Sequence, residues 1–142
     1  MICLDTNAVI SVLNNPGSSI RTRLDEAIQQ GSTLSMSTVV LFELWYGAAK
    51  SARPERNARR IADFLAGPIE VLPFEAGDAE EAGDIRAALE RTGTAIGLYD
   101  VLVAAQARRH DALLITGSGR EFGRVPQLKF EDWTRPIRSK PR

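Results

Sequence analysis

The chain has 142 residues, of which 44% are hydrophobic and 25% are charged, and its formal net charge at pH 7 is zero. These values indicate one folded domain of common size and argue against a broad, charge-driven coat for nucleic acid. A local basic groove beside an acidic site is still compatible with zero net charge. No apolar segment approaches the length needed to span a membrane.

The chain start and the cysteine content bear on the cellular compartment. The first residues form an apolar run of only four residues that ends in an acid, so no secretory signal is expected. The single cysteine, Cys3, lies in this run and cannot form an intramolecular disulfide. A lone buried thiol is typical of a reducing compartment. We therefore expect a cytoplasmic protein.

Apolar runs with the length of strands alternate with helical segments along the chain. In chain order, the pattern predicts a strand at residues 1–5, helices at 7–14 and about 19–30, a strand at 32–35, and helices at about 38–49 and 54–66. A strand at 69–72 and helices at 76–91 and 98–109 follow, and then strands at 113–116 and, more weakly, 128–130. A short turn is expected at residues 120–122.

Several of these boundaries carry ordinary start and stop signals. Gly31 ends the second helix, Pro54 opens the fourth, and Gly67 with Pro68 ends it. Continuous apolar strands separated by helices are typical of a parallel sheet that is covered on both faces. The sequence therefore predicts an α/β fold: a single three-layer domain with a parallel sheet of about five strands, flanked by helices.

Three acidic residues lie in segments that otherwise have the composition of a core. Asp5 ends the first apolar run, Glu43 interrupts the apolar helix 38–49, and Asp100 lies near the start of the apolar helix 98–109. No Lys, Arg or His lies within four residues of any of them. Because acids are almost never fully buried unless something pairs with them, these three positions need an explanation.

Each acid alone has an ordinary explanation. Asp5 could cap the following helix, Asp100 lies in a first helical turn where the dipole favours an acid, and Glu43 could pair with a distant Arg. Together they are harder to explain, because two carboxylates about 4 Å apart repel by about 4 kcal/mol at an effective dielectric near 20. A hard divalent cation, Mg²⁺ or Mn²⁺, would supply the missing charge.

Polar residues near two of the acids fit such a site. Thr6 and Asn7 can hydrogen-bond to Asp5, and Thr116 offers a hydroxyl at the end of the fourth strand. Ser118 lies between two glycines, where the backbone can approach a phosphate closely. Sites in open parallel sheets lie beyond the carboxyl ends of the strands. A metal there would polarise a phosphate and lower the pKa of an attacking water, which is the chemistry of a phosphodiester hydrolase.

Four segments, in this order, resemble one known family. They are LDTN at residues 4–7, LFELWYGA at 41–48, IGLYDVLVAA at 96–105, and LIT at 114–116 followed by REF at 120–122. Together they resemble a PIN domain and, more narrowly, a VapC-type toxin of a bacterial toxin–antitoxin pair. The resemblance extends from residue 1 to about residue 133.

The resemblance implies a five-stranded parallel sheet between helices and an Mg²⁺- or Mn²⁺-dependent endoribonuclease. By motif position, Asp5, Glu43 and Asp100 would be the catalytic, metal-site acids. The residues expected beside them, around the metal or the substrate, are Thr6, Asn7, Thr116 and Ser118. The likeness also implies three partners: an RNA substrate, a small antitoxin that blocks the site, and a second copy of the chain in a homodimer.

The chain departs from the family's pattern after Thr116. The family often has a fourth acid or an Asn there, whereas residues 117–119 are Gly-Ser-Gly. Glu121 matches the family's following acid rather than the missing one, and Ser118 could hold a metal-bound water instead. The departure leaves the number of metals open. It also leaves an alternative: a catalytically weakened PIN-fold module that binds RNA or a partner without cutting.

A second enzymatic alternative is a phosphatase-like nucleophile at Asp5. Such enzymes usually carry a further Asp two residues on, and position 7 is Asn.

Basic and aromatic side chains give weaker signals. Arginines at positions 108, 109, 120 and 124 could border an RNA path, although solvated arginines are the commoner outcome. Trp45 and Tyr46 lie in an apolar helix, where packing is expected rather than base stacking, with a dimer or antitoxin groove as the alternative. Residues 1–133 are expected to form the nuclease domain. Residues 134–142 are expected to form a basic, flexible tail that cannot fold alone.

Overall fold

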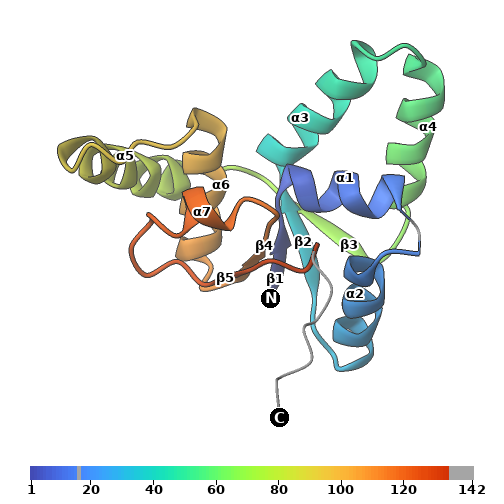
Figure 1. Cartoon of the computed structure of the whole chain (residues 1–142), viewed down its shortest axis with the longest axis horizontal. Helices are drawn as coiled ribbons and strands as arrows, with labels where there is room; N and C mark the ends of the chain where they lie inside the picture. Colours follow the sequence, from blue (N-terminus) through green and yellow to red (C-terminus); the bar gives the residue numbers. More distant parts are fainter. Residues whose placement is uncertain (16, 135–142) are drawn as a thin grey trace.

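The computed structural model describes residues 1–15 and 17–134 (Figure 1). The strands are β1 (Ile2–Leu4), β2 (Leu34–Ser37), β3 (Ile69–Leu72), β4 (Leu113–Ile115) and β5 (Phe130–Glu131). The helices are α1 (Thr6–Asn14), α2 (Ser19–Gln29), α3 (Thr38–Ala49), α4 (Pro54–Leu65), α5 (Ala76–Arg91), α6 (Leu98–Arg109) and α7 (Gly119–Phe122). The predicted basic tail, residues 134–142, lies outside the described residues except for Thr134.

The strands form one parallel sheet in the order β3-β2-β1-β4-β5. The chain therefore builds outward from β1 to β3, crosses back through α5 and α6, and adds β4 on the other side of β1. Right-handed crossovers in opposite directions place their helices on opposite faces of the sheet. Figure 1 shows α1 to α4 on one side of the molecule and α5 to α7 on the other. The predicted α/β fold with five parallel strands is confirmed.

The middle of the sheet is buried, and its strands carry apolar residues or small serines there. All residues of β1 and β2 are buried, as expected for strands that are covered on both faces. The serines of β2 have polar partners despite this burial. The Ser35 hydroxyl lies 3.1 Å from the Ile2 carbonyl, to which it donates, and the Ser37 hydroxyl accepts from the Val39 N–H at 3.0 Å.

Two strands lie further along the chain than the sequence pattern predicts. The second strand was expected at residues 32–35 and is found at Leu34–Ser37, because Ser37 both ends the strand and caps α3. The last strand was expected at residues 128–130 and is assigned at Phe130–Glu131. None of the helices in the described part of the chain has the length and apolar character that a membrane span requires.

The helix pair α5–α6 is joined by an ion pair between a buried aspartate and an exposed arginine. Asp78 is fully buried in the first turn of α5, and one of its carboxylate oxygens accepts from Arg109 at the end of α6, at 3.0 Å. Its other oxygen accepts from the Glu75 N–H at 2.8 Å and so caps the helix. Gly77 leaves space for the guanidinium, because a Cβ there would come within 2.5 Å of it.

Removing the cation of this pair should destabilise the domain. In Arg109→Met the aliphatic stem is kept while the buried Asp78 loses its cationic partner, so the free energy of unfolding should fall by about 2 kcal/mol. Urea denaturation measures the change. The matched control is Arg86→Met, which breaks an exposed pair with Glu90 and should cost at most about 0.5 kcal/mol. Equal effects of the two substitutions would contradict this role.

Candidate active site

The candidate site lies at the carboxyl edge of the two central strands. Asp5 directly follows β1 and Thr116 directly follows β4, and the two strands are neighbours in the sheet. The Asp5 N–H donates to the Ile115 carbonyl at 3.1 Å, which extends the ladder to the edge. The chain continues from β1 to β2 on one side of the sheet and from β4 to β5 on the other. This edge is therefore the topological switch point, where ligands bind in open α/β sheets.

Asp5 is the most buried of the three predicted acids, with 4% of its surface exposed. One of its carboxylate oxygens accepts from the Ala8 N–H at 2.8 Å and caps α1. Burial raises the pKa of Asp5 from 3.8 to about 6, and hydrogen bonds from Thr116 and Ala8 limit the rise. The negative charges of Asp100 and Glu43 raise this pKa further.

Glu43 lies in the middle of α3 and is half-buried. The buried side of this helix is formed by Val40, Leu44 and Ala48, so Glu43 lies beside that stripe. Its Oε1 accepts a hydrogen bond from the Thr6 hydroxyl at 2.8 Å. Thr6 was expected to hydrogen-bond to Asp5, and the structure shows instead that it orients Glu43.

Asp100 occupies the first turn of α6. Its carboxylate folds back toward Gly97, where a Cβ would lie 3.3 Å from Oδ2. Glycine at the helix cap therefore leaves room for this carboxylate, and the positive end of the helix dipole favours its charge. Burial raises the pKa of Asp100, and the charges of Glu43 and then Glu121 raise it further.

The three acids thus act on one another across segments that are far apart in sequence. The charge of Glu43 affects both Asp5 and Asp100, and Asp100 also affects Asp5. In residues 1–15 and 17–134, no Lys, Arg or His forms an ion pair with any of the three. The ordinary explanation for Glu43, an ion pair with an arginine distant in sequence, therefore does not hold within the described residues.

The remaining predicted residues link the loop after β4 to the start of α1. The Ser118 N–H donates to the Thr116 hydroxyl oxygen at 2.8 Å, and the Asn7 side-chain amide donates to the Ser118 hydroxyl oxygen at 3.1 Å. Asn7 was expected to hydrogen-bond to Asp5, whereas the described contact is with Ser118. This contact holds the glycine-flanked loop beside the acids.

Glu121 is a fourth acid near the site. It lies in α7, and its charge raises the pKa of Asp100. Sequence reasoning placed Glu121 after the missing family acid and gave it no ligand role. The sequence feature that could have pointed to Glu121 was its position shortly after the end of β4, in the short helix α7.

The donor set suits a hard divalent cation, because carboxylate oxygens are the ligands that Mg²⁺ and Mn²⁺ prefer. Within the described residues, no three Asp, Glu, His or Cys side chains lie close enough together to coordinate one ion. This spacing fits Mg²⁺, which typically takes one or two carboxylates and keeps several waters. It does not fit a closed cage of protein ligands.

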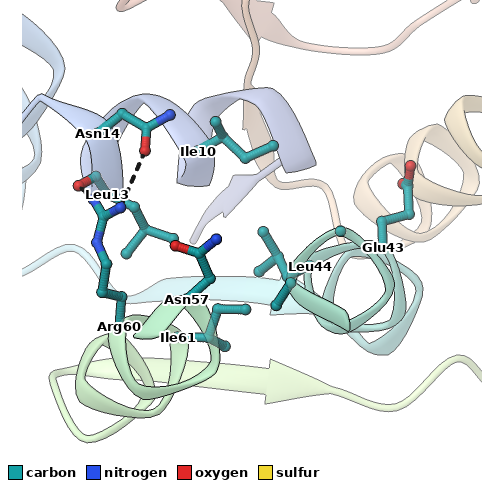
Figure 2. A pocket seen from close by; sticks show the side chains of 10 residues that line it. Ile10, Leu13, Asn14, Glu43, Leu44, Asn57, Arg60 and Ile61 are labelled. Carbon is teal, nitrogen blue, oxygen red and sulfur yellow. Dashed lines mark hydrogen bonds between the residues drawn. The ribbon is translucent and has the colours of Figure 1, made fainter. Parts of the chain in front are cut away.

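A cavity of about 250 Å³ borders the site between α1, α3 and α4 (Figure 2). Leu44 and Ile61 form its apolar floor, and Glu43 lies at its rim with the carboxylate pointing away from that floor. At the other end, the Arg60 guanidinium donates to the Leu13 carbonyl and, at 3.4 Å, to the Asn14 side chain. Arg60 therefore joins α4 to the end of α1.

The fold and the site define an α/β protein with acids at the switch point of a parallel sheet, and comparisons give its family. The chain matches the PIN domain family over residues 2–128. It is 41% identical over 131 residues to the tRNA(fMet)-specific endonuclease VapC of Shigella flexneri, which covers 92% of this chain and 96% of that protein. This chain belongs to the PIN domain family, and VapC endonucleases are its relatives within it.

Solved structures agree with this assignment. The fold is similar to a chain of VapBC2 from Rickettsia felis bound to a DNA fragment from their promoter, with a TM-score of 0.88 and 34% identity, covering 94% of this chain and 99% of that one. A chain of DNA-bound VapBC from Salmonella typhimurium gives a TM-score of 0.86 and 37% identity, covering 93% and 97%. These structures share the fold over nearly the whole chain.

The pKa of Asp5 predicts how stability depends on pH. Between about pH 4 and pH 6 the folded metal-free protein binds more protons at Asp5 than the unfolded chain, so its free energy of unfolding falls as pH rises through this window. Asp5→Asn removes the titration and keeps a capping side chain. In chelator at pH 7.5 the variant should be more stable than the wild type, by up to about 3 kcal/mol.

Urea denaturation at a series of pH values measures this difference, which should vanish below about pH 4. The matched control is Asp111→Asn, which removes an exposed acid paired with Lys129 and should leave the Asp5-dependent fall in stability in place. A stability difference between wild type and Asp5→Asn that is the same at pH 4 and pH 7.5 would show that folding does not raise the pKa of Asp5.

Proposed function

We propose that this chain is a divalent-metal-dependent endoribonuclease that hydrolyses phosphodiester bonds in RNA as the toxin of a toxin–antitoxin pair. The observation that carries the proposal is that the charges of Asp5, Glu43 and Asp100 act on one another, while none of these acids has a basic partner in the described chain. The names of the relatives support the reaction, because they include ribonucleases and a tRNA-specific endonuclease.

Asp5, Glu43 and Asp100 are proposed to hold Mg²⁺ or Mn²⁺, directly or through water. A bound cation would polarise the scissile phosphate and lower the pKa of an attacking water. The chain's own residues prepare for this. Thr116 favours the ionised form of Asp5, because its hydrogen bond lowers that pKa, and Thr6 fixes the orientation of Glu43.

The loop at residues 117–119 is proposed to receive the phosphate. Glycine on both sides of Ser118 lets the backbone approach an anion closely. The hydrogen bonds from Asn7 and to Thr116 hold Ser118 in place, so the loop is ordered before substrate arrives. Such prior ordering lowers the entropy that binding must otherwise remove.

The structure bears on both alternatives. The alternative of a catalytically weakened binding module rests on the missing fourth acid. Glu121 lies near enough to Asp100 to supply a fourth negative charge, which weakens that argument. The aspartyl-phosphatase reading needs an acid at position 7, and the Asn7 amide is hydrogen-bonded to Ser118. Neither alternative is favoured by a contact in the described chain.

The relatives also suggest a substrate and a partner. The relative from Shigella flexneri is named as specific for tRNA(fMet), so tRNA is the first RNA to test with this chain. A tRNA substrate would place the reaction in the cytoplasm. The similar solved chains come from VapBC complexes, which supports a protein antitoxin for this chain as well. The homodimer implied by the family resemblance stays a prediction.

Cleavage of RNA by the purified protein tests the reaction. Wild type should cut tRNA in Mg²⁺ or Mn²⁺ and stop when a chelator is added. Asp5→Asn and Asp100→Asn should each lower kcat/KM at least about a hundredfold, because each removes charge that holds the cation. Thr6→Val, which only frees Glu43, should cost about tenfold.

The control for charge removal is Asp111→Asn, which removes an exposed acid that lies before the start of β4 and pairs with Lys129, and which should cut like wild type. Equal cutting by Asp5→Asn and wild type, with the fold intact by circular dichroism, would contradict the proposed mechanism.

Expression in a bacterium tests the biological role. The chain alone should arrest growth, and Asp100→Asn should not, because arrest requires cleavage. Co-expression with the protein encoded directly upstream should restore growth if that protein is the antitoxin. Unimpaired growth with the soluble wild-type chain would argue against a toxin.

A further inference from the structure

A second cavity, of about 620 Å³, opens beside Glu43, one of the three acids. Thr6 and Glu43 line it, and these two residues are already joined by a hydrogen bond within the candidate site. Any chain that occupies this cavity therefore passes next to Glu43. The opposite wall comes from the outer side of α3 and the start of α6.

That wall is aromatic and exposed. Phe42, Tyr46 and Tyr99 line the cavity, with 52%, 57% and 44% of their surfaces exposed. The rings of Phe42 and Tyr46 are nearly parallel with centroids 6.3 Å apart, and the ring of Tyr99 lies 5.7 Å from that of Phe42. The sequence pattern favoured packing for Tyr46 and left a dimer or antitoxin groove as the alternative, and its exposure argues against packing in the interior. A contiguous exposed aromatic surface of this kind marks a binding site.

A cation accompanies the rings. Lys50 lies one turn beyond Tyr46 on α3, lines the same cavity, and places its ammonium 4.7 Å from the Tyr46 ring centroid. Within the described chain Lys50 has no carboxylate partner at salt-bridge distance. It is therefore available to an external anion.

The arginines that the sequence suggested for an RNA path are largely engaged elsewhere. Arg108 pairs with Glu81, Arg109 pairs with Asp78, and Arg124 donates to the Ala95 carbonyl. Among the residues that line this cavity, Lys50 is the basic one.

We propose that Phe42, Tyr46, Tyr99 and Lys50 form a nucleotide-binding subsite for single-stranded RNA beside the acids. This inference rests on the proposed ribonuclease function and names residues that position its substrate. The aromatic rings stack on bases, and Lys50 contacts a phosphate. Stacking accepts any base, because every base has a π face, so the subsite positions the strand rather than reading its sequence.

The charges of the site favour this arrangement over a basic groove. A row of arginines beside Asp5, Glu43 and Asp100 would pair with these acids and compete with the cation. Aromatic surface adds affinity for RNA without adding charge. A single lysine at the far end of α3 supplies one phosphate contact at a distance from the acids. An apolar peptide would have no use for that phosphate contact, which is why RNA is the favoured occupant.

Binding of a labelled, short single-stranded RNA to the cleavage-deficient Asp5→Asn protein tests the subsite. Fluorescence anisotropy in Mg²⁺ gives the affinity. Adding Tyr46→Ala or Phe42→Ala should weaken binding about tenfold, whereas Tyr46→Phe should keep it within about twofold because the ring remains. The matched control is Trp45→Ala, which removes an exposed aromatic of the same helix that does not line this cavity.

The salt dependence of binding separates the role of Lys50 from that of the rings. Lys50→Ala should reduce the slope of log affinity against log salt by about 0.7, the value for one phosphate contact on a single strand. Tyr46→Ala should lower affinity with the slope unchanged. Lys129→Ala, which breaks an exposed pair with Asp111, should change neither quantity.

Kinetics in the otherwise wild-type protein complete the test. Tyr46→Ala should raise KM for RNA about tenfold with kcat nearly unchanged, as expected for a positioning residue. Unchanged RNA affinity and KM in Tyr46→Ala and Phe42→Ala would overturn the subsite. So would unchanged RNA binding together with an altered molecular mass in light scattering, which would assign this surface to a protein interface.

Failure of the proposed function gives a different result. A wild-type protein that cuts no RNA, but whose RNA affinity still depends on Tyr46 and Lys50, would overturn the ribonuclease and support an RNA-binding surface on this fold.

Discussion

The site depends on one electrostatic constraint: a carboxylate is held in the interior at the end of the central strand. Asp5 is almost fully buried, yet it is fixed there because it caps α1 and continues the ladder to β4. Its raised pKa measures how unfavourable the ionised form is in the metal-free protein. The strain is of the kind that a divalent cation relieves, and it arises from the same contacts that join the sheet to its first helix.

Helix α3 shows how one element serves several purposes. Its Val40, Leu44 and Ala48 pack into the core, while Glu43 lies at the edge of that face beside the site. The outer side carries Tyr46 and its neighbouring lysine, which are exposed to solvent. Because residues three and four apart share a face of a helix, a single helix separates packing, charge and substrate contact on adjacent surfaces.

The rigid support for the site comes from the opposite side of the sheet. Helices α5 and α6 pack together and are joined by the ion pair of Asp78 and Arg109. This pair holds the end of α6 that is distant from Asp100. Acids that repel one another need such support, because otherwise the elements that carry them would move apart.

The sequence by itself determined the element types, the parallel sheet and the acidic residues proposed for the site. Apolar runs of strand length and helical segments such as α5 and α6 predicted the element types and the sheet. Elements that are buried on both faces can be recognised in this way, because their residues are largely apolar in the local sequence. Only the tertiary structure decided that Thr6 orients Glu43, that Glu121 approaches Asp100, and that Tyr46 is exposed. Hydrogen-bond partners distant in sequence leave no local pattern. Helix α3 is apolar nearly all round, so periodicity could not tell its buried face from its exposed one.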